Sequence, residues 1–151
     1  MSNLDKFAEG LQSQIMKDLE KTYSKKVIEH WKNPKNWGIM NDADGYGKVT
    51  GPCGDTMEFS IKVKDNVIIS CTFDTDGCGT TIACASIITK MVTNKPISYA
   101  KSITQTSVLD TCGGLPEDNI HCALLAANTL HATIENYEET KSHLWKKLYR
   151  K

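Results

Sequence analysis

Hydrophobic residues recur at helical spacing at the start of the chain. The apolar positions in the first twenty residues lie three or four residues apart: Leu4, Phe7, Leu11, Ile15 and Leu19. This spacing predicts an amphipathic helix, which Gly10 weakens. Because an isolated helix of this length is marginal in water, we expect the apolar stripe to pack against the body of the chain or against a second copy of it.

The middle of the chain alternates between apolar and polar residues, which is the pattern of half-buried strands. Residues 57–63 are apolar at every second position, and the next run has its apolar residues on one predicted face: Val67, Ile69, Cys71 and Phe73. Lys64–Asn66 separates the runs as a turn, so a hairpin with one buried face is predicted. Residues 48–50 predict the end of a third strand, and residues 35–47 resemble a loop.

Helical patterns flank this hairpin. One helix is predicted before Asn33-Pro34, and the others follow the strands; together their ranges are 24–31, 80–92, 98–103, 106–110 and 122–137. We predict an α+β fold in which helices pack on a small antiparallel sheet of about three strands. The chain divides into an N-terminal amphipathic helical extension (1–22), a main domain (23–140) and a basic C-terminal tail (141–151) that continues the last helix.

Length and charge exclude some classes of protein. The 151 residues fit one domain with a core, and 18 basic residues balance 18 acidic ones. Nucleic-acid binders usually carry a basic excess, so no nucleic-acid partner is expected. No apolar run approaches the roughly 20 residues that span a bilayer, so no membrane association is expected either. The first residues also lack the basic and apolar segments of a secretory signal, and we predict a cytoplasmic protein.

The six cysteines then need an explanation, since a reducing compartment favours metal binding or thiol chemistry over disulfides. We interpret Cys71, Cys84 and Cys112 as packing residues. Cys53 lies in the turn Gly51-Pro52-Cys53-Gly54-Asp55, where an accessible thiol is expected. Cys78 and Cys122 lie at predicted helix starts, where free N–H groups and the helix dipole lower the pKa of a thiol.

Asp55 and His121 add an oxygen and a nitrogen ligand to these thiols. The candidate set is Cys53, Asp55, Cys78, His121 and Cys122. Such a set suits iron or zinc. Two other interpretations stay open on the residues alone. One is a structural zinc module that stabilises the fold. The other is a cysteine-nucleophile hydrolase using Cys53 or Cys122 with a histidine and Asp55, although no oxyanion-hole or nucleophile-elbow motif accompanies it.

Four segments carry a resemblance to a known family. They are Tyr23–Gly38, Gly51–Met57 (GPCGDTM), Asp76–Ser86 (DGCGTTIACAS) and Gly113–Leu130 (GGLPEDNIHCALLAANTL). In this order they resemble the IscU/NifU N-terminal family of iron–sulfur cluster assembly scaffold proteins. The resemblance implies a small sheet carrying helices, with the functional residues gathered at one exposed end.

The resemblance also implies residue roles and partners. The family's cluster cysteines fall on Cys53, Cys78 and Cys122, its aspartate on Asp55 and its histidine on His121. It implies a scaffold and not an enzyme. A cysteine desulfurase delivers persulfide sulfur, with Cys53 and Cys122 as accepting candidates, iron binds, and a ferredoxin-type donor supplies electrons. A [2Fe–2S] cluster then forms and passes to acceptor apoproteins, while zinc can occupy the same site.

Some residues depart from the family pattern. Bacterial IscU proteins typically carry Leu-Pro-Pro-Val-Lys before the His-Cys pair, the segment read by a dedicated Hsp70 chaperone. Here residues 115–119 are Leu-Pro-Glu-Asp-Asn, which puts a chaperone interaction in question and is closer to NifU-like forms. Cys84, Cys112 and the N-terminal helix are also additions. We expect a homodimer when a cluster is bound, with that helix contributing to the contact.

Overall fold

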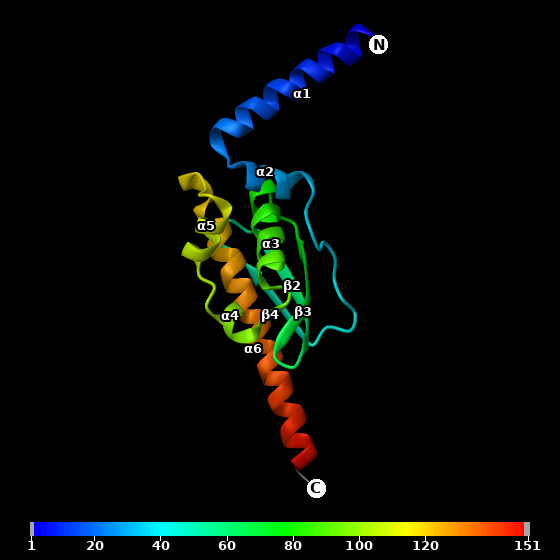
Figure 1. Cartoon of the computed structure of the whole chain (residues 1–151), viewed down its shortest axis with the longest axis vertical. Helices are drawn as coiled ribbons and strands as arrows, with labels where there is room; N and C mark the ends of the chain where they lie inside the picture. Colours follow the sequence, from blue (N-terminus) through cyan, green and yellow to red (C-terminus); the bar gives the residue numbers. More distant parts are fainter. Residues whose placement is uncertain (1, 150–151) are drawn as a thin grey trace.

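The fold is a four-stranded antiparallel sheet covered by helices, with one further helix standing apart (Figure 1). The computed structural model describes residues 2–149, and side chains from 2 to 144. The helices are α1 (Asn3–Thr22), α2 (Lys25–Lys32), α3 (Gly79–Val92), α4 (Ile97–Lys101), α5 (Gln105–Cys112), the 3-10 helix η1 (Glu117–Asn119) and α6 (Ile120–Tyr149). The predicted fold class is confirmed.

The sheet has the order β1 (Gly45–Thr50), β2 (Thr56–Lys64), β3 (Val67–Thr75) and β4 (Lys95–Pro96). The predicted hairpin is β2–β3, and Asp65 and Asn66 in its turn have φ of 53° and 64°. Positive φ at both central residues is the geometry that suits a tight hairpin. The two-residue edge strand β4 was not predicted, because so short a run ending in proline carries no alternation.

One predicted strand face is wrong at Ile69. The pairing of β2 with β3 shifts between Lys62 and Val63, which pair with Ser70 and Ile68. Ile69 is therefore the extra residue of a β-bulge, and it is 44% exposed, whereas Ile68 is fully buried. The extra residue shifts the alternation along β3, so that Ile68 faces the core and Ile69 faces solvent. A strict alternation in the sequence therefore assigned Ile69 to the core in place of Ile68.

Strand β1 begins at Gly45, inside the segment predicted as a loop. Glycine in a strand marks a close approach of another backbone, and here that backbone is α6. A Cβ on Gly47 would lie 2.5 Å from Thr133 Oγ1 and 2.6 Å from Thr133 N. A Cβ on Gly45 would lie 2.7 Å from Tyr137 Cβ. The two glycines thus let α6 lie directly on β1.

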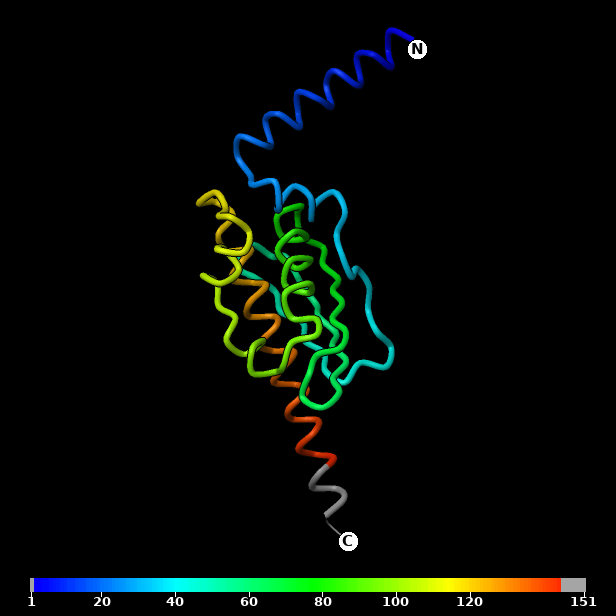
Figure 2. Tube along the Cα trace, viewed as in Figure 1, coloured from blue at the N-terminus to red at the C-terminus, as the bar shows by residue number. Residues whose placement is uncertain are grey.

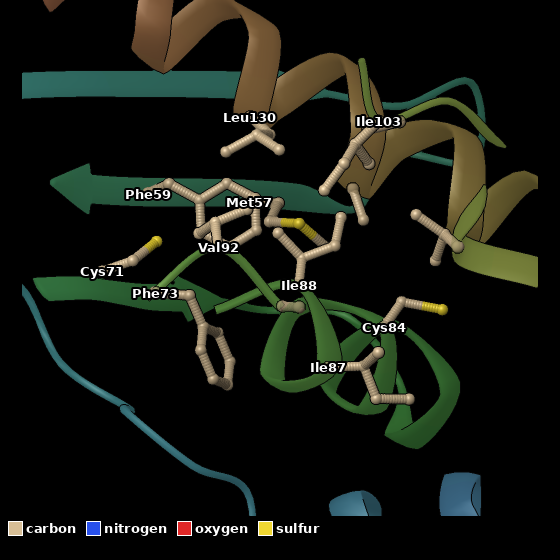
Figure 3. Close-up of a cluster of buried hydrophobic side chains, with 14 of the residues drawn as sticks. Met57, Phe59, Cys71, Phe73, Cys84, Ile87, Ile88, Val92, Ile103 and Leu130 are labelled. Carbon is tan, nitrogen blue, oxygen red and sulfur yellow. The ribbon is translucent and has the colours of Figure 1, made fainter. Parts of the chain in front are cut away.

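Helices α3 and α6 provide most of the core against the sheet (Figure 3). Met57, Phe59 and Phe73 from the strands meet Ile88 and Leu130 from the helices, and all five are buried. The predicted inner face of α6 is confirmed at Ala123, Ala127, Leu130 and Ile134. Among the residues that the structure describes, no helix is both long and apolar enough to cross a membrane.

The predicted helix at the N-terminus is present, but its apolar stripe is not covered by the rest of the chain. Helix α1 extends away from the body (Figure 2), and none of its residues is buried. Leu4, Phe7, Leu11 and Ile15 are between 48% and 75% exposed. Packing of this stripe on the body, one of the two expected outcomes, is therefore not observed.

The last helix begins at Ile120, two residues before the predicted start. Helix α6 continues through the basic segment to Tyr149, so the expected helical continuation of the tail is confirmed up to that residue. The final two residues of that segment, 150–151, lie outside the described part of the chain. The division into extension, main domain and tail stays a prediction.

Candidate functional site

The predicted ligands come from three segments: the β1–β2 loop, the start of α3 and the start of α6. The loop is closed by two backbone hydrogen bonds, Gly51 N to Asp55 O at 2.8 Å and Gly54 N to Gly51 O at 3.0 Å. Gly54 has a φ of 88°, a conformation that favours glycine. Cys53 at the loop tip is exposed, and Asp55 is half-buried.

Cys78 is the N-cap residue of α3 and is exposed, as its helix-start position predicts. His121 and Cys122 lie in the first turn of α6, directly after η1. The His121 Nε2 and Cys122 Sγ atoms are 3.7 Å apart. Cys122 is fully buried, so the expectation that all the ligands lie at an exposed end is wrong for this thiol. It lies under the first turn of α3, where the packing of the two helices excludes water.

A threonine that the sequence did not single out joins these segments. The Thr81 Oγ1 atom lies 3.3 Å from Asp55 Oδ2, 3.4 Å from Cys122 Sγ and 3.6 Å from Cys78 Sγ. Thr81 is itself fully buried, in the first turn of α3. The structure therefore brings together Asp55, Cys78 and Cys122 through one hydroxyl. The only signal in the sequence was the position of Thr81, three residues after Cys78.

His121 joins this group through Cys122, whereas Cys53 remains at its edge. In the described part of the chain, no hydrogen bond links the Cys53 thiol to the other candidates. A charge on Cys53 would raise the pKa of the Cys122 thiol. The described side chains of His, Cys, Asp and Glu form no cluster of three in metal-binding geometry. Holding an ion would therefore require these side chains to come closer together than they are in this structure.

The electrostatic environment of Cys78 favours its thiolate. Burial alone would raise its pKa, but the backbone N–H groups of Thr81 and Thr80 and the Thr81 hydroxyl outweigh that effect, so the pKa is lowered. Cys78 makes no side-chain capping bond, so these N–H groups act as oriented dipoles at the free helix end. The lowered pKa of Cys78 is the effect that its place at a helix start predicted.

The same prediction is wrong for Cys122. Burial raises the pKa of its thiol to about 11, the Thr81 hydroxyl lowers it, and the charges of Cys78 and Cys53 raise it further. Desolvation of the thiolate thus outweighs the helix dipole. A metal ion that binds Cys122 has to compensate the thiolate for the water that burial removes from it.

The other three cysteines are buried, as predicted for packing residues. Burial raises the pKa of Cys71 to about 12, so it stays a neutral thiol in the core. A hydrogen bond with Cys112 and burial both raise the pKa of Cys84 well above its usual value. None of the three is exposed for exchange with a partner.

The sequence matches a known protein family over most of its length. The NifU-like N-terminal domain matches residues 22–143. The chain is 45% identical over 118 residues to the protein named "Iron-sulfur cluster assembly scaffold protein IscU" of Aquifex aeolicus, covering 76% of this chain and 75% of that protein. It is 40% identical over 124 residues to the protein of the same name from Escherichia coli K12, covering 79% and 96%.

A solved structure shares the fold. The N-terminal NifU-like protein from Brucella abortus superposes with a TM-score of 0.60 at 20% identity, covering 77% of this chain and 94% of that one. At this identity the likeness concerns the fold alone. It agrees with the arrangement of the sheet and helices in Figure 1.

Proposed function

The chain belongs to the NifU-like N-terminal domain family and is an iron–sulfur cluster assembly scaffold, and we propose that it builds a [2Fe–2S] cluster and passes it on. The cluster is the cargo of this protein and not a resident cofactor. The observation that carries the proposal is the gathering of Asp55, Cys78 and Cys122 around Thr81, beside the exposed Cys53.

Sulfur enters at Cys53. Its exposure allows a desulfurase persulfide to reach it, whereas the buried Cys122, the other accepting candidate, must first be uncovered. The Cys53 thiolate attacks the terminal sulfur of the donor persulfide, a new S–S bond forms on Cys53, and the desulfurase thiolate leaves. Exposed thiols in polar surroundings exchange sulfur most readily.

Iron is held by Cys53, Asp55, Cys78, His121 and Cys122. Thiolates are the usual ligands of iron–sulfur clusters, and imidazole and carboxylate also bind iron. Asp55 supplies a harder ligand than a fourth thiolate, so it is the ligand most easily displaced when the cluster leaves. Its half-buried position at the loop supports this role.

The partners follow from this chemistry. A cysteine desulfurase supplies the sulfur, a ferredoxin-type protein the electrons, and apoproteins accept the cluster. The protein itself turns over no substrate. Its free thiols suit the reducing cytoplasm, which we keep as the expected compartment. The exposed apolar stripe of α1 supports the proposed homodimer, since a second copy can cover it.

Anaerobic reconstitution tests the proposal against a zinc module. The protein is incubated with a desulfurase, cysteine, Fe²⁺ and a reductant, and then with an apo-ferredoxin. We expect the visible absorption of a [2Fe–2S] cluster, followed by its appearance on the acceptor. A protein that binds Zn²⁺ and stays folded but never gains this absorption would support the zinc alternative instead.

A further inference from the structure

The side chain of Thr81 lies among the proposed ligands without belonging to the set. Its hydroxyl oxygen is within 3.3 to 3.6 Å of one atom each of Asp55, Cys122 and Cys78. These three residues come from the β1–β2 loop and from two different helices. Among the described residues, Thr81 is thus the one whose side-chain hydrogen bonds join all three segments of the site.

The hydrogen-bonding capacity of a hydroxyl matches these neighbours. A threonine hydroxyl offers one donor and two acceptor lone pairs. The hydroxyl donates its one hydrogen to Asp55 Oδ2, which can only accept when ionised. The Cys78 and Cys122 thiols donate to its two lone pairs while they are protonated, and a thiolate at either position competes with Asp55 for the hydroxyl hydrogen. All three of its positions are therefore used within the site. A buried hydroxyl with such partners orients them, because moving any one leaves a polar group unpaired.

The orientation of Thr81 is itself fixed by a close contact with glycine. A Cβ on Gly77 would lie 2.6 Å from Thr81 Cγ2 and 2.9 Å from Thr81 Oγ1. The Thr81 side chain therefore fills the space beside the Gly77 backbone. Because a β-branched side chain in a helix has few χ1 rotamers, the hydroxyl is held toward the ligands. Serine would keep the hydroxyl but lose the methyl group that makes this contact.

We propose that Thr81 is a positioning residue that orients Asp55, Cys78 and Cys122 for metal binding through its hydroxyl. The inference rests on the proposed function, since it concerns the same ligands. Side chains that hydrogen-bond metal ligands fix their direction, and removing such a partner typically weakens metal affinity about 10- to 100-fold. Thr81 acts through the ligands and is not counted among them.

Titration with Co²⁺ under anaerobic, reducing conditions tests this proposal, because thiolate-to-cobalt absorption reports both affinity and thiolate coordination. Thr81→Val removes the hydroxyl at nearly constant volume, and we expect its Kd for Co²⁺ to rise about 10- to 100-fold. Thr81→Ser should restore most of the affinity. The matched control is Thr129→Val, because Thr129 is equally buried but its hydroxyl bonds only to Leu125 O of its own helix, at 2.7 Å. This control should bind Co²⁺ like the wild type.

Circular dichroism and thermal unfolding are measured on each variant. A folded Thr81→Val protein that binds Co²⁺ like the wild type would overturn the proposal. If Thr81→Val does not fold, Thr81→Ala takes its place, and wild-type affinity in that variant counts equally against the proposal. Failure of the wild type to bind Co²⁺ through thiolates would overturn the proposed function as well, so the two failures are distinguishable.

Discussion

Cys122 and Cys71 are both buried, yet their surroundings differ in kind. Cys122 lies between two helix starts, with the Thr81 hydroxyl 3.4 Å and the His121 Nε2 3.7 Å from its sulfur. Cys71 lies on β3 opposite Ile61, inside the core drawn in Figure 3, and burial is the one cause that shifts its pKa. Burial alone therefore does not separate the proposed ligand thiol from a packing thiol. Among the described residues, the two thiols are distinguished by the polar atoms near the sulfur, which Cys122 has and Cys71 lacks.

The sharpest test of this comparison exchanges sulfur for oxygen in both regions. Cys53→Ser, Cys78→Ser and Cys122→Ser should each reduce the cluster absorption to background in anaerobic reconstitution, because an alcohol is a poor ligand for iron in a cluster. Cys71→Ser should form the cluster normally per folded molecule. It should lose about 1–3 kcal/mol of unfolding free energy, since its hydroxyl has no partner in the core. Normal clusters in one of the first three variants would remove that residue from the ligand set.

Alkaline pH tests the core thiol Cys71 through its effect on the unfolding free energy. The pKa of Cys71 is raised to about 12, whereas a thiol in the unfolded chain ionises near 8.5. Above that pH the unfolded chain loses a proton that the folded protein keeps. As the pH rises above this value, Cys71 therefore lowers the unfolding free energy by up to about 1.4 kcal/mol per pH unit, until its folded pKa is reached.

Denaturant unfolding of wild type and Cys71→Ala between pH 8 and pH 10.5 measures this contribution. The variant should show the shallower fall in unfolding free energy, even though it is less stable at pH 7. Parallel curves for the two proteins would mean that the Cys71 thiol ionises as readily in the core as in water.

Asp55 tests the site region with a smaller change. Asp55→Ala should lengthen the lifetime of a bound cluster or weaken iron loading several-fold, because it removes the hard, displaceable ligand. The fold should stay native by circular dichroism, since Asp55 is half-buried in a loop closed by its own backbone. Unchanged lifetime together with unchanged iron affinity would make Asp55 a turn residue only.

Removing residues 1–20 should have the smallest effect on either region. Helix α1 buries none of its residues, so the unfolding free energy of the body should change by less than about 0.5 kcal/mol. Light scattering on the apo and cluster-loaded forms, with and without this segment, tests the proposed homodimer. We expect the full-length loaded form to be a dimer and the truncated form to dimerise less. A monomer in all four samples would exclude it.

The sequence predicted features that depend on local pattern. The β2–β3 hairpin, the helices and the inner face of α6 follow from alternation, turn residues and helical spacing. It failed where the structure depends on contacts distant in sequence. The bulge at Ile69 and the early start of β1 at Gly45 are set by pairing and by α6, which local periodicity does not report.

The site shows the same division. The positions of Cys53, Asp55, Cys78, His121 and Cys122 in turns and helix starts could be inferred from the sequence. The burial of Cys122 could not, because it results from the packing of α3 against α6. The part played by Thr81 was missed for a related reason. A threonine in the first turn of a helix is ordinary until the loop that carries Asp55 is seen beside it.

The contact of Gly47 with Thr133 sets the spacing between the strand and the helix that carry parts of the site. Strand β1 ends at Thr50, three residues before Cys53 in the loop. Helix α6 runs back from Thr133 to Cys122 over eleven residues, about 16.5 Å at 1.5 Å per residue. A Cβ on residue 47 would clash with the backbone of Thr133, so the close spacing of strand and helix at this point requires glycine. The distance between the Cys53 loop and the Cys122 thiol therefore depends on a contact that includes neither residue. A larger residue at position 47 should misalign the two halves of the site while leaving every ligand in the sequence.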